Sequence, residues 1–385
     1  MRHLHGSVGA TDGEPAADTA LDPELSAHLF GSLRRSGQRL KAEQYVRGLL
    51  ALEGRKTLRG IAAQFDGAAA QQSVHHFISA SPWDWMPVRH ALAREVQRAL
   101  APQAWVIRPI LIPKAGSHSV GIDQQLLPLG RIVNGQHAVG AWLASGHCAV
   151  PVDWQLRLSD RWLTDPLRQR ASVPADAAVA TIEDCVRAAV ADIREIGGVL
   201  RGPVVVDVGE VDAVAVARHL AALGVAFVVR VGPQAQLWLD RTELPSYSGR
   251  EHTVGELAES LPRLRRQVNP GDGPTTAVAI PVVTSPARGE RMLLLGEWRP
   301  AGRPRRRLWL TNADAPSVLT ALRLTRLPGV VLRDFTAISE RVGVRDFGGR
   351  SFPGWHRHIT LASVAHLIAT LENRRPLLPG GRAGR

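Results

Sequence analysis

The stretch from Trp105 to Ile122 constrains the fold more than any other part of the chain. Residues 105–107 and 110–112 are apolar and rich in β-branched side chains, which predicts a buried strand. Pro113, Gly116 and Ser117 predict a turn, residues 118–125 an extended segment, and residues 133–144 a third strand. Strand, turn, strand and a longer third strand form a meander, which we expect at the centre of the fold.

Before this stretch the pattern is helical. Thr57 can cap a helix whose apolar residues recur at helical spacing, and Asp66-Gly67 ends it. A second helix, about residues 68–78, would bury one face and expose Gln71, Gln72 and His75. This layout is typical of a helix-turn-helix, whose second helix enters the major groove, but any helical hairpin gives the same pattern. The surrounding basic cluster favours DNA and includes Arg55, Lys56 and Arg59.

After the meander, strands and helices alternate. Residues 203–207 and 226–231 are predicted strands, separated by a helix over about 212–223, and this order indicates a mixed sheet with helices on both sides. Residues of about 232–311 interrupt the alternation with three β-like runs, and helices return after them. We therefore predict a disordered tail (1–23), a helical domain (24–101), an α/β domain (102–372) with a β insertion at about 232–311, and a flexible tail (373–385).

The composition limits the classes of partner that we expect the protein to bind. The net charge is +12, which favours a polyanion over an uncharged partner, with nucleic acid ahead of an acidic membrane surface. Only two cysteines are present, with no CxxC spacing, so neither a zinc site nor a disulfide framework is expected. Without a long apolar run, we expect a cytoplasmic protein with double-stranded DNA as its partner and no membrane contact. A homodimer stays open.

Three blocks resemble the catalytic domain of bacterial insertion-sequence DDE transposases, which have an RNase H-like fold. The first block, "WVIRPILIPKAGSHSVGI", keeps Pro113, Lys114, Gly116 and His118 of the family's W-V-I-D-D-T-G-F-P-K-K-G-x-H-S-V-G. The second, "VVVDVGEVD", places the family's catalytic aspartate on Asp207. The third, "VGVRDFGGRSFPGWHRHITL", contains Arg350, His356 and His358. The resemblance implies that Lys114, His118, Arg350, His356 and His358 contact DNA. For Lys114 and His118 the alternative is a solvated turn, and for His356 and His358 it is helix packing.

The carboxylates of that family hold two Mg²⁺ ions for DNA cleavage and strand transfer. By resemblance, Arg108 and Pro109 stand at the first carboxylate position and Leu332 at the third, so only Asp207 is retained. Asp212 is expected to cap a helix. We therefore predict an inactive transposase relative that binds DNA but no metal or other cofactor, in which Arg108 pairs with Asp207. Two alternatives stay open: an active transposase with displaced ligands, and a protein-interaction scaffold.

Overall fold

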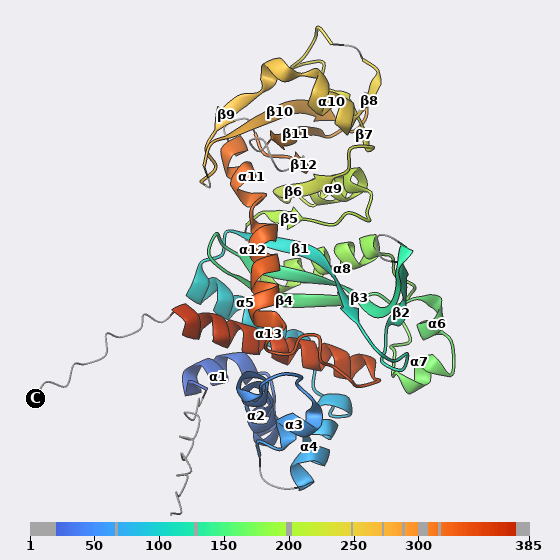
Figure 1. The fold of residues 1–385 in the computed structure, drawn as a ribbon, viewed down its shortest axis with the longest axis vertical. Helices are drawn as coiled ribbons and strands as arrows, with labels where there is room; N and C mark the ends of the chain where they lie inside the picture. Colours follow the sequence, from blue (N-terminus) through green and yellow to red (C-terminus); the bar gives the residue numbers. More distant parts are fainter. Residues whose placement is uncertain are drawn as a thin grey trace, which may run out of the picture.

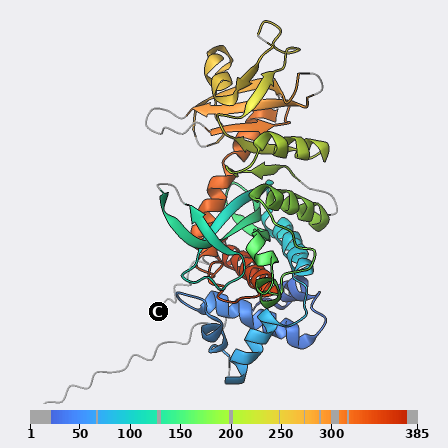
Figure 2. The same ribbon diagram turned by 90° about the vertical axis from the view of Figure 1, so that its right-hand side faces the viewer.

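The computed structural model describes residues 21–374, apart from 66–67, 127–129, 198–201, 248, 272, 287–288, 299–306 and 315–316. Most of the predicted N-terminal tail and nearly all of the C-terminal tail therefore lie outside the described residues. The described chain forms three tiers along its long axis (Figures 1 and 2). N-terminal helices lie at one end, a sheet with covering helices lies in the middle, and the strands of the predicted insertion lie at the other end.

The first tier contains helices that form where the sequence predicts them. Thr57 caps the short third helix, because its side chain accepts a hydrogen bond from the Gly60 backbone N–H at 3.0 Å. The fourth helix buries Val74, Phe77 and Ile78. The helices of this tier are α1 (Pro23–Phe30), α2 (Ser36–Ala51), α3 (Leu58–Ala62) and α4 (Ala68–Ser79). Helix α5 (Met86–Leu100) follows them, lies beside the sheet of the middle tier and contacts α1 (Figure 1).

The middle tier is built on the predicted meander. Strand β1 pairs antiparallel with β3 along its whole length, and on its other side it pairs parallel with β5, which in turn pairs parallel with β6. Both β2 and β4 pair with β3. Strand β2 is shorter than expected, because Gly121 has φ +73° and forms a turn before it. The strands are β1 (Ala104–Pro113), β2 (Ile122–Leu126), β3 (Ile132–Ala144), β4 (Ala149–Leu156), β5 (Val204–Val206) and β6 (Phe227–Val231).

The predicted insertion continues the same sheet. Strand β12 pairs antiparallel with β6, so the hydrogen-bonded order runs β2-β3-β1-β5-β6-β12-β11-β10-β7-β8, with β9 paired to β10. The described residues thus form one 12-stranded mixed sheet, consistent with the predicted RNase H-like α/β fold. The added elements are β7 (Gln236–Leu239), β8 (Glu251–Thr253), α10 (Val254–Ser260), β9 (Arg266–Val268), β10 (Thr275–Val283), β11 (Arg291–Trp298) and β12 (Arg307–Thr311).

Helices cover both faces of the middle strands. Both α8 and α12 contact β1, β3 and β4, and Figures 1 and 2 show them on opposite faces. Helix α8 begins later than residue 177, because Thr181 and Asp184 cap it with reciprocal hydrogen bonds. The remaining helices are α6 (Asp160–Leu163), α7 (Leu167–Arg170), α8 (Ile182–Gly197), α9 (Ala213–Ala222), α11 (Val318–Leu324), α12 (Leu327–Asp334) and α13 (Phe352–Arg374), with a short 3₁₀ turn at Pro262–Leu264 and a π-helical turn at Phe335–Ser339.

Helix α13 lies between the first two tiers. It contacts β4 on one side and α2 and α4 on the other, and Figure 1 shows it crossing the molecule between them. Because both sides are covered, seventeen of its residues are buried. No described helix is long and apolar enough to cross a membrane.

Candidate functional site

Asp207 lies at the end of a buried strand, at the position where the sequence predicts it. The three valines of β5 are fully buried, and the Asp207 backbone N–H donates to the Ile107 carbonyl at 3.0 Å. Since β1 and β5 are parallel neighbours, with Ile107 opposite Val206, the next residue of each strand reaches the same edge. Arg108 and Asp207 are those residues, and Asp207 is only 6 % exposed.

Two arginines flank the Asp207 carboxylate. Arg108 Nε lies 3.2 Å from Oδ2, which is the ion pair that the sequence predicts. Arg230, on β6, donates from Nη1 to Oδ1 at 3.0 Å. Arg108 also donates from Nη1 to the Pro328 carbonyl of α12 at 3.0 Å. Burial lowers the pKa of Arg108, with Asp207 opposing the shift. Both carboxylate oxygens therefore face a cationic side chain.

The other residues that the resemblance places at carboxylate positions carry no ligand oxygen in their side chains. Pro109 lies in β1 beside Arg108, and Leu332 projects from α12 with 54 % of its surface exposed. Both carboxylate oxygens of Asp334, two residues after Leu332, have other partners. Oδ2 accepts from the Ala149 N–H at 2.8 Å, and Oδ1 accepts from Arg333 Nε at 2.8 Å. It supports the start of β4 and does not turn toward Asp207.

Three other carboxylates also have structural partners. Asp212 caps α9, as expected, and accepts from the backbone N–H groups of residues 214 and 215. Asp123 accepts from the Ser159 hydroxyl, and Asp346 accepts from the Lys56 backbone N–H. No group of three or more His, Cys, Asp or Glu side chains converges as a metal site within the part of the chain that the structure describes. Mg²⁺ prefers several hard oxygen ligands, and one carboxylate between two guanidinium groups does not fit it.

The face of α4 predicted to contact DNA is exposed. Gln71, Gln72 and His75 point outward, while the opposite face packs inside the helical tier. Arg55 and Arg59, next to Thr57, are exposed as well. DNA contact by these side chains stays a prediction, and the structure adds that they are accessible.

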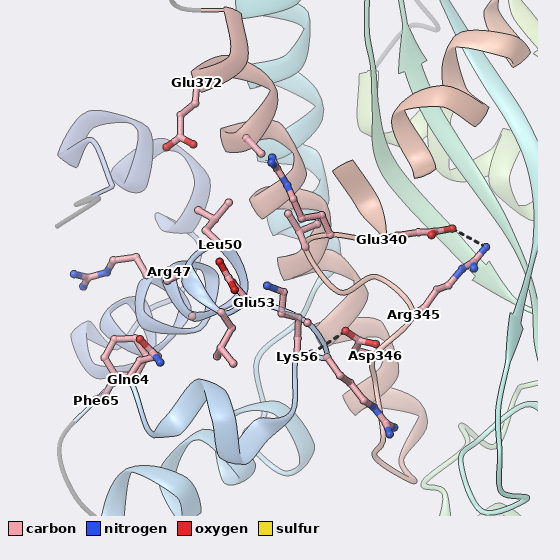
Figure 3. Close-up of a pocket in the computed structure, with 18 residues that line it drawn as sticks. Arg47, Leu50, Glu53, Lys56, Gln64, Phe65, Glu340, Arg345, Asp346 and Glu372 are labelled. Atoms are coloured by element: carbon pink, nitrogen blue, oxygen red, sulfur yellow. Dashed lines mark hydrogen bonds and ion pairs between the residues drawn. The ribbon is translucent and has the colours of Figure 1, made fainter. Parts of the chain in front are cut away.

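Lys56 differs from its basic neighbours, because only 3 % of the residue is exposed. Burial lowers the pKa of its side chain, and its backbone N–H donates to Asp346 Oδ2 at 2.8 Å. Lys56 lines a cavity of about 1130 Å³ between the helical tier and the chain that precedes α13 (Figure 3). The described lining carries both charges: Arg47, Arg55, Lys56, Arg341 and Arg345 against Glu53, Glu340, Asp346 and Glu372.

His356 and His358 lie in the interior, which corrects the expectation that they contact phosphate. They are 5 % and 1 % exposed. His356 Nδ1 lies 3.0 Å from Arg89 Nη2, so the ring accepts and is neutral; burial lowers its pKa. His358 Nδ1 lies 2.8 Å from the Tyr45 hydroxyl, and Nε2 donates to the Gly343 carbonyl. Burial lowers the pKa of His358 to about 4. Both histidines hold α13 in place.

Lys114, His118 and Arg350 lie close to one another but differ in their contacts. Lys114 Nζ donates to the carbonyls of Arg345 and Phe347 at 2.7 and 2.8 Å, which ties the chain before α13 to the end of β1. Burial lowers the pKa of Lys114 to about 8. His118 and Arg350 are exposed and line one cavity of about 590 Å³. Two further arginines of that cavity, Arg161 and Arg170, were not singled out from sequence.

A buried arginine that the sequence did not indicate joins α5 to β4 and α13. Arg89 of α5 is 1 % exposed, and its Nη1 lies 2.5 Å from Asp153 Oδ1 on β4. The same guanidinium donates to the Thr360 hydroxyl at 2.9 Å and the Trp154 carbonyl at 3.2 Å. Its only sequence signal is an arginine at an apolar position of an amphipathic helix. Asp153 also accepts from Gln155, which donates to Asp192 as well.

Comparison with known proteins identifies the family. No curated protein matches the chain. The model of the DDE superfamily endonucleases matches residues 28–290, which include most of the helical tier, Arg108 and Asp207. The match extends over more than half of the chain, and the mixed sheet agrees with it. This chain therefore belongs to the DDE superfamily endonuclease family and is transposase-like.

Proposed function

We propose that this transposase-like protein binds DNA but has lost metal-dependent cleavage, because an ion-pair cluster stands where family members bind metal. The observation that carries the proposal is the setting of Asp207. Its two carboxylate oxygens lie 3.2 Å from Arg108 Nε and 3.0 Å from Arg230 Nη1. We call Arg108, Asp207 and Arg230 the Asp207 cluster.

The cluster opposes metal binding in two ways. Two-metal cleavage requires carboxylates that hold the ions on either side of the reacting phosphate, and a guanidinium group has no lone pair to donate. A Mg²⁺ ion near Asp207 would also have to displace two cations that already neutralise the carboxylate. Arg108 is anchored a second time by the Pro328 carbonyl, so it does not swing away freely.

DNA binding is supported by the exposed side chains of the helical tier and by the net charge of +12. Arg55 and Arg59 are accessible for phosphate contacts, and Gln71, Gln72 and His75 are accessible on α4 for contacts with base edges. Phosphate contacts set affinity and its dependence on salt, whereas base contacts set sequence preference. The two groups of residues therefore predict two separable effects.

The test is fluorescence anisotropy of duplex DNA with the full-length protein between about 50 and 200 mM salt, a range in which several phosphate contacts weaken affinity by orders of magnitude. We expect Arg55→Gln with Arg59→Gln to weaken binding to every duplex and to reduce the salt slope by about one per lost contact. We expect Gln71→Ala with His75→Ala to reduce sequence preference more than general affinity. The control is Arg323→Gln, an exposed arginine on α11.

Two outcomes would reject the DNA-binding part. Affinity that does not change with salt would contradict a phosphate interface, and no binding to any duplex in a random-sequence pool would favour a protein-interaction scaffold instead. The full chain is needed, because α2 and α4 pack against α13 and the fragment 24–101 would lose that contact.

A further inference from the structure

A second cationic site lies beside the turn that follows β1, separate from the Asp207 cluster. Its cavity of about 590 Å³ is formed by four chain segments: the turn, α6, α7 and the residues before α13. We call it the arginine pocket. The described residues that line it are Ser117, His118, Arg161, Trp162, Leu167, Arg170, Ala171 and Arg350.

No acidic side chain of the described lining balances the positive charge of the arginine pocket. Three arginines and a histidine line it, and none of its described lining residues is acidic. Arg161, Arg170 and Arg350 form no side-chain ion pair or hydrogen bond with another described residue; Arg161 lies over the Trp162 ring, with Cζ 5.4 Å from the ring centroid. The cavity of Figure 3 provides the contrast, because four acidic residues there balance five basic ones. Uncompensated guanidinium groups around one cavity favour a bound anion.

The chain segments that carry the three arginines of the pocket are fixed relative to one another. Trp162, 1 % exposed, donates from Nε1 to the Ile122 carbonyl at 3.1 Å and anchors α6 on β2. The Phe352 N–H donates to the Ala171 carbonyl at 2.7 Å and joins α7 to the start of α13. Lys114 fixes the segment that leads to Arg350. A ligand therefore meets an arrangement that exists before it binds.

We propose that the arginine pocket binds a phosphate group carried on a nucleotide. Arginine forks match phosphate oxygens with paired hydrogen bonds, and the Ser117 hydroxyl and His118 ring add polar groups at the rim. The volume exceeds what a lone phosphate ion needs and is in the range of about 300–1,000 Å³ typical of small-molecule sites. Trp162, Leu167 and Ala171 supply an apolar wall for a sugar or base. The choice of a nucleotide rests on the proposed DNA-binding function.

The nucleotide has two sources, free in solution or at the end of a DNA strand, and a matched set of probes separates them. Calorimetry with the full-length protein compares thymidine 5′-monophosphate with thymidine, and a decanucleotide that has a 5′-phosphate with one that has a 5′-hydroxyl. We expect each phosphorylated probe to bind at least about tenfold more tightly than its partner, the loss typical of a charged hydrogen bond. Similar affinities for the two phosphorylated probes indicate the free nucleotide; a tighter decanucleotide indicates a strand end.

The matched variants change the charge in the pocket and elsewhere by the same amount. Arg161→Gln, Arg170→Gln and Arg350→Gln together are expected to remove the preference for phosphate. The control, Arg94→Gln with Arg241→Gln and Arg323→Gln, removes three exposed arginines that do not line the pocket and should retain the preference.

A second variant does not depend on the arginines. Ser117→Glu places a carboxylate at the exposed rim of the pocket and should abolish phosphate binding while the melting temperature stays unchanged.

Three results would overturn the proposal: equal binding of phosphorylated and unphosphorylated probes, equal loss in the pocket and control variants, or an oligoglutamate peptide that binds the pocket while nucleotides do not.

The experiments distinguish failure of the pocket proposal from failure of the proposed function. Salt-dependent duplex binding that is unchanged in the pocket variants, with no phosphate preference, rejects the pocket alone. Nucleotide binding without any duplex binding rejects the proposed function alone.

Discussion

Asp153 and Asp207 both pair with arginine, on strands that flank the β3–β1 pair, yet their surroundings differ. The Arg89–Asp153 side chains are 1 % and 0 % exposed, and the arginine also contacts α13 and the chain of β4. The side chains of Arg108 and Arg230 are 24 % and 46 % exposed, and Asp207 lies at the open end of its strand. The first pair holds α5 on β4, whereas the second neutralises a carboxylate where we propose that family members bind metal. Arginine–aspartate pairing alone therefore does not indicate which purpose a pair serves.

The largest effect is expected at Arg89. Arg89→Met keeps an unbranched apolar stem but leaves the buried Asp153 without a cation, so we expect a loss of about 3–5 kcal/mol in the free energy of unfolding. Urea denaturation of the full chain measures it. Arg94→Met, on the same helix with an exposed side chain that forms no ion pair with another described residue, is the control and should change little. A loss below about 1 kcal/mol at Arg89 would mean that the pair does not hold α5 on β4.

Arg108 is expected to matter less for stability. After Arg108→Met, Asp207 still pairs with Arg230, and only the bond to the Pro328 carbonyl and one partly exposed ion pair are lost, so we expect about 1–2 kcal/mol. The double variant with Arg230→Met should lose more than the sum of the two single variants, because Asp207 is then buried without a cation. Strict additivity in that cycle would contradict the view that the two arginines share one carboxylate.

A smaller, pH-dependent effect is expected beside the Arg89–Asp153 pair. Burial and the nearby Asp153 raise the pKa of Asp192 to about 7. A carboxyl whose pKa is raised on folding stabilises the fold at pH values below its unfolded pKa of about 4, and that contribution is lost as the pH rises through about 7. Asp192→Asn should therefore be more stable than the natural chain at pH 8, by at least the roughly 1.4 kcal/mol that one pKa unit is worth, and about equal at pH 4. Urea titrations at both pH values measure the difference, and no change with pH would contradict it.

The sequence predicted features that depend on local pattern. The strands of the meander, the exposed face of α4 and the Thr57 and Asp212 caps follow from periodicity and capping, and the position of Asp207 beside Arg108 follows from the resemblance. The pairing of β12 with β6 did not follow, because a strand's partner is chosen by tertiary packing. The predicted boundary at residue 101 is untested, although α5 packs on β4 through Arg89.

Several site residues could not be placed from the sequence. Arg230 lies in a short apolar strand, and only the neighbouring parallel strand brings it to Asp207. His356 and His358 stand two residues apart on a helix, so a one-sided helix would expose one of them. Helix α13 is covered on both sides, and it buries both. Arg161 and Arg170 lie far from His118 and Arg350 in the sequence, so only the structure shows that the four residues line one cavity.

The central claim is that the Asp207 cluster replaces the metal site, and nicking of supercoiled plasmid by the unmodified protein tests it most directly. The assay contains Mg²⁺ or Mn²⁺, and Asp207→Ala serves as the matched variant. We predict no nicking above background with either ion, because Arg108 and Arg230 already neutralise the one carboxylate retained from the family's set. Metal-dependent nicking that disappears in Asp207→Ala would contradict the claim and identify the protein as an active transposase with displaced ligands.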